Sequence, residues 1–244
     1  MPPRKAKAST TKTSISTSKP NLPDEGSSRR SNPPWPALGL YPPPSSRSLT
    51  LHTLLPHQIL TIDLLTSKEC HSLISHALST FPLTPANPGL VPKKGEAFRD
   101  NDRVSLVDPE FAEQLWRNTG LAGVCETQSN EVWDAKSRRP VGLNSNIRIY
   151  RYRPGQRFGA HYDDSTKDPC SGIQTEWTLL IYLSSVARGG ETVFYLEKGR
   201  GEVVAEPRAG MALLHRHGRH CLLHEAKEVV EGEKWILRSD LLFA

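Results

Sequence analysis

From Asn146 to the C-terminus the chain consists of short apolar runs separated by turn residues, and this spacing limits the fold more than any other feature. Residues 147–152 alternate between apolar and polar side chains with a period of two, which is the pattern of a strand with one buried face. Further runs of strand-forming residues follow at 157–162, 177–183, 191–196, 202–205, 211–214, 220–224 and 235–243. About eight short strands with turn signals between them predict a β-sandwich or barrel.

Two helices are predicted before these strands. Thr66 can cap the first helix, because Glu69 follows three residues later as the second member of a capping box, and apolar residues then recur on one face. Asp108 begins the second helix, with Pro109 in its first turn. Residues 120–142 are expected to form an irregular connection. Helices that precede a run of strands indicate an α+β, mainly β domain in which the helices pack on one sheet.

The N-terminal part differs in composition from the rest of the chain. Residues 1–48 are rich in Ser, Thr, Pro, Lys and Arg and hold too little apolar surface to offset the entropy of ordering, so we expect a disordered tail there and a folded domain over 49–244. Residues 1–50 contain eight basic and two acidic residues, whereas the rest contains 23 and 24. The net charge of +5 therefore belongs to the tail, and the folded domain lacks the basic surface of a nucleic-acid enzyme.

Targeting signals are sparse. No apolar run approaches the ~20 residues that span a bilayer, and no secretory signal is recognisable, so no membrane partner is expected and a cytoplasmic or nuclear location is predicted. A mitochondrial location is the alternative, because the first 23 residues contain no acid, although four prolines there oppose an amphipathic helix. The four cysteines are widely spaced without a C-x-x-C pair, which favours reduced thiols.

His161 and Asp163 are the first candidates for a metal site. On a strand, side chains two residues apart point to the same face, so an imidazole nitrogen and a carboxylate oxygen could converge on one ion. Two histidines and a carboxylate leave three metal positions open, which is the arrangement of non-haem Fe(II) oxygenases. Proximity in the sequence does not distinguish among the candidates for the third ligand, which are His215, His217, His220 and His224. Alternatively, these four histidines could form a zinc cluster.

The spacing between His224 and the cation Lys234 is informative. Lys234 lies ten residues after His224, across a turn at Glu231-Gly232. A strand, a turn and a second strand of that length can place both side chains on neighbouring strands that face one interior.

Residues 146–244 resemble the catalytic domain of prolyl 4-hydroxylases, within the Fe(II)/2-oxoglutarate-dependent dioxygenase superfamily. Four motifs in the same order and spacing carry this resemblance: Arg151-Tyr152-x-x-Gly155-Gln156-x-Phe158-x-x-His161-x-Asp163, Thr178-Leu-Leu-Ile-Tyr-Leu183, Gly189-Gly190-Glu191-Thr192 and His224-x4-Val229-x2-Gly232-x-Lys234-Trp235. Residues 61–116 match more loosely, through Ser67-Lys-Glu-Cys70 at the start of the first helix.

The resemblance implies a double-stranded β-helix, or jelly roll, with its core at 146–244 and iron held by His161, Asp163 and His224. It assigns Lys234 to the distal carboxylate of 2-oxoglutarate, and a buried dianion does need a fixed cation. Tyr152 and Thr178 are implied as hydrogen-bonding neighbours of this co-substrate, and Phe158 stands where the family usually has Tyr. Arg238 is a rival to Lys234, since both would face the same side of a strand and Arg suits a bidentate carboxylate contact.

The implied activity is that of a 2-oxoglutarate-dependent dioxygenase, which uses Fe(II), 2-oxoglutarate and O₂, with ascorbate as a candidate reductant. Such an enzyme oxidises 2-oxoglutarate to succinate and CO₂ and hydroxylates an unactivated C–H bond, by resemblance that of a prolyl residue in a protein or peptide. The alternatives are a small-metabolite hydroxylase with the same iron centre and an inactive jelly-roll binding protein. The segment from Gly95 to Arg103, which contains Arg99 and Asn101, is interpreted either as a loop over the substrate or as plain surface. The sequence leaves the substrate, the position hydroxylated, the oligomeric state and the role of the tail open.

Overall fold

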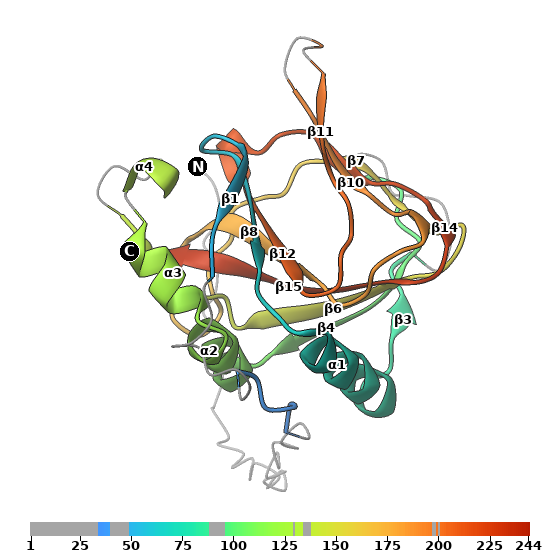
Figure 1. Ribbon diagram of the computed structural model, residues 1–244, viewed down its shortest axis with the longest axis horizontal. Coiled ribbons are helices and arrows are strands. Elements are labelled where there is room, and N and C mark those ends of the chain that lie inside the picture. The colour runs from blue at the N-terminus through green and yellow to red at the C-terminus, as the bar shows by residue number, and fades with distance from the viewer. Residues whose placement is uncertain are drawn as a thin grey trace, which may run out of the picture. The chain divides into compact units, whose positions relative to one another are not determined.

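Two facing antiparallel β-sheets form the centre of the structure, a computed structural model that describes residues 34–39, 49–87, 96–128, 130–133, 138–196, 199 and 201–244 (Figure 1). In spatial order the large sheet contains β1 (His52–Leu55), β2 (Ile59–Asp63), β12 (Met211–Arg216), β8 (Thr175–Tyr182), β15 (Lys234–Phe243), β6 (Asn146–Tyr152), β4 (Asp102–Val107) and β3 (Thr84–Pro85), while β5 (Pro140–Leu143) also pairs with β15. The small sheet contains β11 (Glu202–Ala205), β10 (Thr192–Tyr195), β13 (His224–Ala226) and β7 (Phe158–His161). A two-stranded ribbon joins β14 (Val229–Glu231) to β9 (Arg188–Gly189).

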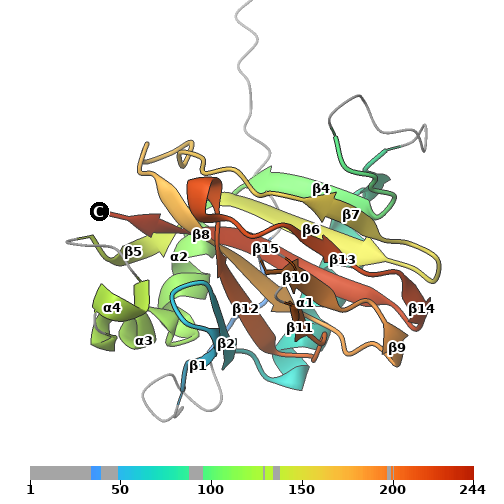
Figure 2. The ribbon, with the colours of Figure 1, turned by 90° about the horizontal axis from the view of Figure 1, so that it is seen from above.

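The helices cover one face of the large sheet, as the sequence predicted (Figure 2). They are α1 (Ser67–Thr80), α2 (Pro109–Asn118), α3 (Leu121–Thr127) and α4 (Asn130–Trp133). Alternation along β6 explains the two layers, because Ile147 and Ile149 pack into the helix-side core whereas Tyr150 and Tyr152 pack toward the small sheet. The inner face of the large sheet and the small sheet thus enclose a second, smaller core. Among the described residues, no helix is long and apolar enough to cross a membrane.

The first helix begins as predicted. Thr66 is its N-cap, and the capping box is complete, since the Thr66 amide donates to Glu69 Oε2 at 2.8 Å and the Glu69 amide donates to Thr66 Oγ1 at 3.3 Å. Asp108 is the N-cap of α2, and its side chain accepts a hydrogen bond from the amide of Phe111 at 2.9 Å. The strands expected between 147 and 243 are present with end shifts of a few residues, except that residues 218–220 form a 3-10 turn and β13 begins only at His224.

The prediction of an irregular connection over 120–142 was wrong. This stretch contains α3, α4 and β5, and Leu121, Cys125 and Trp133 are buried in the helix-side core. The two helices are short, so their apolar residues do not complete the two turns that a periodicity argument needs. They are stable because they pack on the sheet and not because of their own sequence.

Residues 34–39 pack into the domain, although the sequence placed them in a tail of residues 1–48. The Trp35 ring stacks on Phe111 with centroids 3.9 Å apart, and its indole N–H donates to Asp108 Oδ2 at 2.8 Å. Leu38 is buried, and the Gly39 amide donates to Glu69 Oε1 at 2.7 Å. The average composition of residues 1–48 gave no sign that two apolar side chains, Trp35 and Leu38, would be buried in the helix-side core.

Replacing Trp35 with alanine should therefore destabilise the domain by about 3 kcal/mol, since it removes a large aromatic side chain from a packed site. Urea denaturation measured by circular dichroism gives this free energy of unfolding. Leu78→Ala on α1 is the control, because Leu78 is 55% exposed and its loss should change stability by less than about 0.5 kcal/mol. Equal stability of Trp35→Ala and the wild type would mean that residues 34–39 do not dock in solution.

Candidate functional site

Three side chains from two paired strands of the small sheet converge on one point. His161 ends β7 and His224 begins β13, directly opposite each other in the antiparallel pair, and Asp163 lies just beyond β7. Nε2 of His161 is 3.7 Å from Asp163 Oδ1, and Nε2 of His224 is 3.8 Å from Asp163 Oδ2. The donor atoms of all three lie within 4.8 Å of one another, a spacing that suits one shared ion at bonds of about 2 Å.

Asp163 reaches this point from a loop and not from the strand that the sequence predicted. β7 ends at His161, so the rule that residues two apart share a strand face does not apply. Instead the backbone holds Asp163 in place: its amide donates to Cys221 Sγ at 3.2 Å, and its carbonyl accepts from the amide of Gly218 at 2.8 Å. The segment before β13 therefore positions the carboxylate that follows β7.

The two histidines present their Nε2 atoms to the centre. Nδ1 of His161 lies 2.8 Å from the carbonyl of Gly159, and Nδ1 of His224 lies 2.9 Å from the carbonyl of Leu222. In the tautomer that donates these bonds, the Nε2 lone pair is free for a metal. Burial, aided by the neighbouring His224, lowers the pKa of His161 to about 4, and burial also lowers the pKa of His224. Both rings are therefore neutral near pH 7, the form that binds metals.

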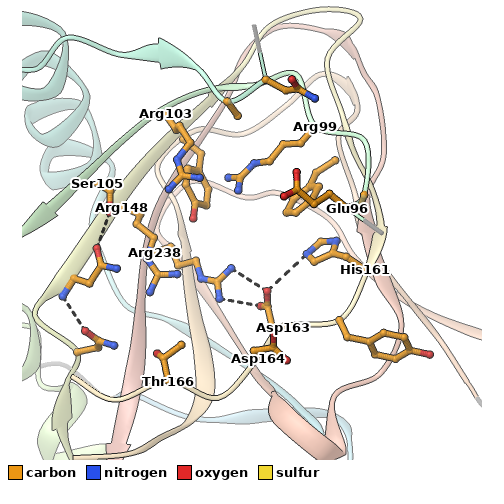
Figure 3. Close-up of a pocket in the computed structure, with 18 of the residues that line it drawn as sticks. Glu96, Arg99, Arg103, Ser105, Arg148, His161, Asp163, Asp164, Thr166 and Arg238 are labelled. Carbon is orange, nitrogen blue, oxygen red and sulfur yellow. Dashed lines mark hydrogen bonds and ion pairs between the residues drawn. The ribbon is translucent and has the colours of Figure 1, made fainter. Parts of the chain in front are cut away.

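Asp163 remains ionised although it is buried. Burial raises the pKa of its carboxyl, but the Arg238 guanidinium and the neighbouring histidines hold that pKa well below the usual value. Arg238 Nη1 donates to Oδ1 and Nη2 contacts Oδ2, each at 3.1 Å (Figure 3). Thr178 Oγ1 donates to Oδ2 at 2.9 Å. This carboxylate is thus charged and oriented before any metal arrives.

Thr178 was expected beside 2-oxoglutarate, and the structure places it elsewhere. Its hydroxyl lies between Asp163 and Nδ1 of His217, 3.0 Å from the latter, and it does not line the cavity around Lys234. The reason is register, because Thr178 pairs with Asp240 of β15 and so lies six residues along that strand from Lys234. Its observed contact is with the carboxylate that could bind the metal.

Thr178→Val should therefore weaken metal binding about tenfold, since outer partners of a ligand typically contribute 10- to 100-fold to metal affinity. The substitution keeps the side-chain shape and removes the donor to Asp163. Mn(II) titration followed by electron paramagnetic resonance measures the affinity. Thr61→Val, at a buried threonine of β2 outside the site, should leave that affinity unchanged. An unaltered affinity in Thr178→Val would show that Arg238 alone suffices to orient the carboxylate.

The other histidines do not join in one four-histidine cluster. His215 is buried, with Nε2 3.6 Å from Asp163 Oδ2, whereas His217 contacts Thr178 and His220 lies on an exposed turn. His215, Cys221 and His224 form a second group with donor atoms within 4.8 Å, but this group shares His224 with the first. Burial raises the pKa of the Cys221 thiol to about 11, so the thiolate that a metal requires is disfavoured there.

Lys234 faces this centre from the large sheet, and not from a strand next to His224 as the sequence suggested. The side chain is fully buried, Nζ donates to the Gly190 carbonyl at 2.5 Å, and the rings of Tyr152 and Tyr182 lie 5.5 and 5.4 Å from Nζ. Among the described residues, no carboxylate lies within ion-pair distance of Nζ. Burial lowers the pKa of Lys234 to about 7, and the more distant charge of Glu191 opposes this shift only in part. A buried ammonium without a carboxylate partner is costly, and an anionic ligand would remove that cost.

The glycine pair of the third motif makes room for this contact. Gly189 and Gly190 have φ values of 79° and 75°, which disfavour other residues. A Cβ at Gly189 would lie 2.3 Å from the Glu228 carbonyl oxygen. The backbone therefore turns tightly between β9 and β10 and directs the Gly190 carbonyl at Lys234.

A cavity of about 30 Å³ joins the two halves of the site. The carboxylate and histidines line one end and Lys234, Tyr152 and Thr192 line the other. This volume holds about two waters, so a larger anion requires movement of flexible side chains such as Lys234 itself. Sequence reasoning missed Tyr182, whose hydroxyl is 2.8 Å from Thr192 Oγ1 beside Lys234. Tyr182 lies four residues after Thr178 on the same strand and therefore on the same face. This spacing is the sequence signal that could have identified it.

Phe158 and Arg99, which both line the large groove, make contacts with aromatic rings at the site. The Phe158 ring stacks on His161 at 3.7 Å, so the side chain that replaces the family's usual Tyr supports a candidate ligand. The Arg99 guanidinium lies over Tyr150 and Phe158, 4.4 and 4.5 Å from their ring centres. Of the segment predicted as either a cover or plain surface, Gly95 lies outside the described residues. Residues 96, 97, 99 and 103 line a large groove that also contacts His161 and Asp163.

Two imidazoles and one carboxylate that converge beside an open groove match the donor set of non-haem Fe(II) oxygenases. Residues 147–239 match the family model described as the 2OG-Fe(II) oxygenase superfamily, so the predicted resemblance of this part of the chain to that superfamily is confirmed. The description of the family names iron(II) and 2-oxoglutarate as the cofactors of its members.

Individual relatives agree with this assignment. Prolyl 4-hydroxylase 13 of Arabidopsis thaliana is 31% identical over 119 residues, which cover 41% of this chain and 43% of the relative. Probable prolyl 4-hydroxylase 9 of the same plant is 26% identical over 190 residues, or 70% of this chain and 63% of the relative. The chain thus spans less than two thirds of the length of either protein.

A solved structure supports the fold. The prolyl hydroxylase from Trichoplax adhaerens, in complex with a peptide fragment of the hypoxia inducible factor oxygen degradation domain, superposes with a TM-score of 0.56. The match covers 76% of this chain and 84% of that chain at 14% identity. The predicted jelly roll with helices on one sheet is thereby confirmed.

Proposed function

We propose that this chain is an Fe(II)- and 2-oxoglutarate-dependent dioxygenase that hydroxylates a prolyl residue of a protein or peptide. One observation carries the proposal: the fully buried Lys234, with no carboxylate within ion-pair distance among the described residues, faces the two-histidine, one-carboxylate centre across a single cavity. That pairing matches a ligand with a metal-binding end and a distal carboxylate. The family match and the names of the relatives support the same reading.

Each residue has a defined part in this proposal. His161, Asp163 and His224 would hold the iron, and Lys234 would hold the distal carboxylate of 2-oxoglutarate. When bound, iron and 2-oxoglutarate supply the oxidation of an unactivated C–H bond by O₂. Arg238 and Thr178 keep Asp163 ionised and oriented. Asp163, His224 and Lys234 are buried, and low solvent exposure strengthens electrostatic contacts to the co-substrate.

The substrate is the least constrained part of the proposal. Prolyl residues are proposed because the similar plant proteins are named prolyl 4-hydroxylases, and a peptide is proposed because the Trichoplax relative was solved with one. An open groove of about 1420 Å³ runs beside the centre, larger than the roughly 300–1,000 Å³ of small-molecule pockets. A small metabolite would leave most of this groove unfilled.

Anaerobic titration with Fe(II) and then 2-oxoglutarate tests the cofactor part, because a metal-bound 2-oxo acid gives a visible charge-transfer band. Succinate release in air, with ascorbate as reductant, then compares a pool of proline-containing peptides with a pool of metabolites, and mass spectrometry finds the product that is heavier by one oxygen. Absence of 2-oxoglutarate binding would favour an inactive jelly-roll protein. A hydroxylated metabolite with unmodified peptides would retain the oxygenase and reject the prolyl substrate.

Lys234 should also make the stability of the ligand-free protein depend on pH. Its pKa of about 7 in the folded state is lower than 10.5, so between these values the unfolded chain binds more protons and stability rises with pH. Relative to Lys234→Met, the free energy of unfolding of the wild type should rise by up to about 1.4 kcal/mol per pH unit between pH 7 and 9.5. Urea denaturation at several pH values measures the difference. Parallel pH profiles of the two proteins would contradict a depressed pKa.

A further inference from the structure

The groove beside the centre has a basic wall. It runs along β4, β6 and β15, and three arginines on these neighbouring strands point into it (Figure 3). The register explains the row: Arg148 lies opposite Arg238 of β15, and Arg103 lies opposite Tyr150 of β6. Like charges on neighbouring strands repel, so the arrangement needs either internal carboxylates or an anionic ligand.

Internal carboxylates account for two of the arginines. Arg148 Nη2 donates to Asp240 Oδ2 at 2.6 Å, and Arg238 is bound by Asp163 and Asp240. Of these carboxylates, Asp163 belongs to the candidate metal group and Asp240 is buried. These two guanidinium groups are therefore largely neutralised by the protein itself.

Arg103 and Arg99 are not neutralised in this way. Within the described part of the chain, neither has a carboxylate within ion-pair distance. Arg99 Nε donates to Asn101 Oδ1 at 2.7 Å, but its Nη2 is buried without a hydrogen-bond partner in that part of the chain. Besides Asp163, the carboxylates that line the groove are Glu96 and Asp164. Two guanidinium groups that line the groove thus lack a carboxylate within ion-pair distance in the described part of the chain.

The positive charge of the arginines also shifts the pKa of a neighbouring phenol. Burial raises the pKa of the Tyr150 phenol, yet Arg238, Arg99 and Arg148 outweigh it and lower that pKa to about 8. Burial and the adjacent arginines also lower the pKa of Arg103. This charge is local, because the chain from residue 51 onward has 23 basic and 24 acidic residues.

We propose that the groove binds a peptide substrate that carries an Asp or Glu close to the residue that is hydroxylated, with the side-chain carboxylate held by Arg103 and Arg99. A guanidinium matches a carboxylate in a bidentate geometry, and a partly desolvated pair of this kind gives both affinity and selectivity. The same groove contacts His161 and Asp163, so a residue bound there lies beside the centre. This inference rests on the proposed function, since it takes the occupant of the groove to be a peptide.

A set of matched peptides tests the inference. Fluorescein-labelled peptides with one central proline carry Asp, Asn, Lys or phosphoserine at each flanking position in turn, and fluorescence polarisation measures their binding to the full chain with Mn(II) and 2-oxoglutarate. We expect at least one position at which the Asp peptide binds about tenfold more tightly than the Asn peptide, with the Lys peptide weakest. The preference should decline with added salt. It should vanish in Arg103→Gln and be reduced in Arg103→Lys, which keeps the charge without the bidentate geometry.

Arg208→Gln is the matched control, since Arg208 is an exposed arginine that pairs with Asp63 outside the groove. It removes the same charge and should retain the preference for Asp. Equal binding of Asp and Asn peptides by the wild type at every position, or equal losses in Arg103→Gln and Arg208→Gln, would overturn the proposal. Tighter binding of phosphoserine than of Asp would overturn the carboxylate assignment. Thermal unfolding of each variant verifies that it is folded.

The binding assay separates this proposal from the proposed function. Preferential binding of Asp peptides without any hydroxylated product would reject the dioxygenase and retain the acidic-peptide groove. Hydroxylation of peptides without a preference for acidic neighbours would retain the dioxygenase and reject the acidic-peptide groove.

Discussion

Asp163→Ala should strongly weaken metal binding and abolish all 2-oxoglutarate-dependent turnover. The substitution removes the carboxylate from the set formed with His161 and His224, so we expect metal affinity to fall by more than about 100-fold, beyond the loss typical of an outer partner. The substitution also removes the bidentate partner of the mostly buried Arg238. Among the described residues, Asp240 then remains as the carboxylate that contacts Arg238. An unpaired buried charge is destabilising, so the thermal midpoint should fall as well.

The measurement is Mn(II) titration by electron paramagnetic resonance, together with the charge-transfer band after anaerobic addition of Fe(II) and 2-oxoglutarate. Asp164→Ala is the control, because this neighbouring carboxylate is exposed and does not belong to the donor group. It should retain metal affinity. A charge-transfer band of full intensity in folded Asp163→Ala would mean that another residue, such as the nearby His215, provides the third ligand.

Lys234→Met should raise the Kd for 2-oxoglutarate by at least about 30-fold and leave metal affinity unchanged. Loss of one partner from a buried charge pair typically costs more than about 2 kcal/mol. The side chain lies on the large sheet, away from the metal donors, so the two effects should separate. Intrinsic tryptophan fluorescence or calorimetry in the presence of Mn(II) gives the affinity for 2-oxoglutarate.

Two further variants decide between the candidate anchors. Lys68→Met removes an exposed lysine of α1 that does not line the cavity, and this variant should bind 2-oxoglutarate normally. Arg238→Met removes the rival cation, whose contacts here are with Asp163 and Asp240, and should affect the metal more than the co-substrate. A larger loss of 2-oxoglutarate affinity in Arg238→Met than in Lys234→Met would reverse the assignment.

Local sequence patterns predicted much of the fold. The capping box of Thr66 and Glu69 depends on residues three positions apart, and it is present as expected. The alternation along β6 also depends on near neighbours, and it separates the two cores correctly. By contrast, α3 and β4 were missed, since each is stabilised by residues distant in sequence. Strand β4 pairs with β6 and turns Arg103 and Ser105 toward the groove, so its buried face has only two apolar residues, Val104 and Leu106.

By itself the sequence determined the strand-rich C-terminal half, the helix starts and, through motif order and spacing, the identity of the residues that meet at the centre. Only the tertiary structure decided how they meet. Asp163 arrives from a loop held by Gly218 and Cys221, and Lys234 faces it from the other sheet. The Arg238–Asp163 pair joins residues 75 positions apart. Periodicity reports which face of its own strand a residue occupies, whereas the distance between two strands depends on how both sheets pack, which no local pattern contains.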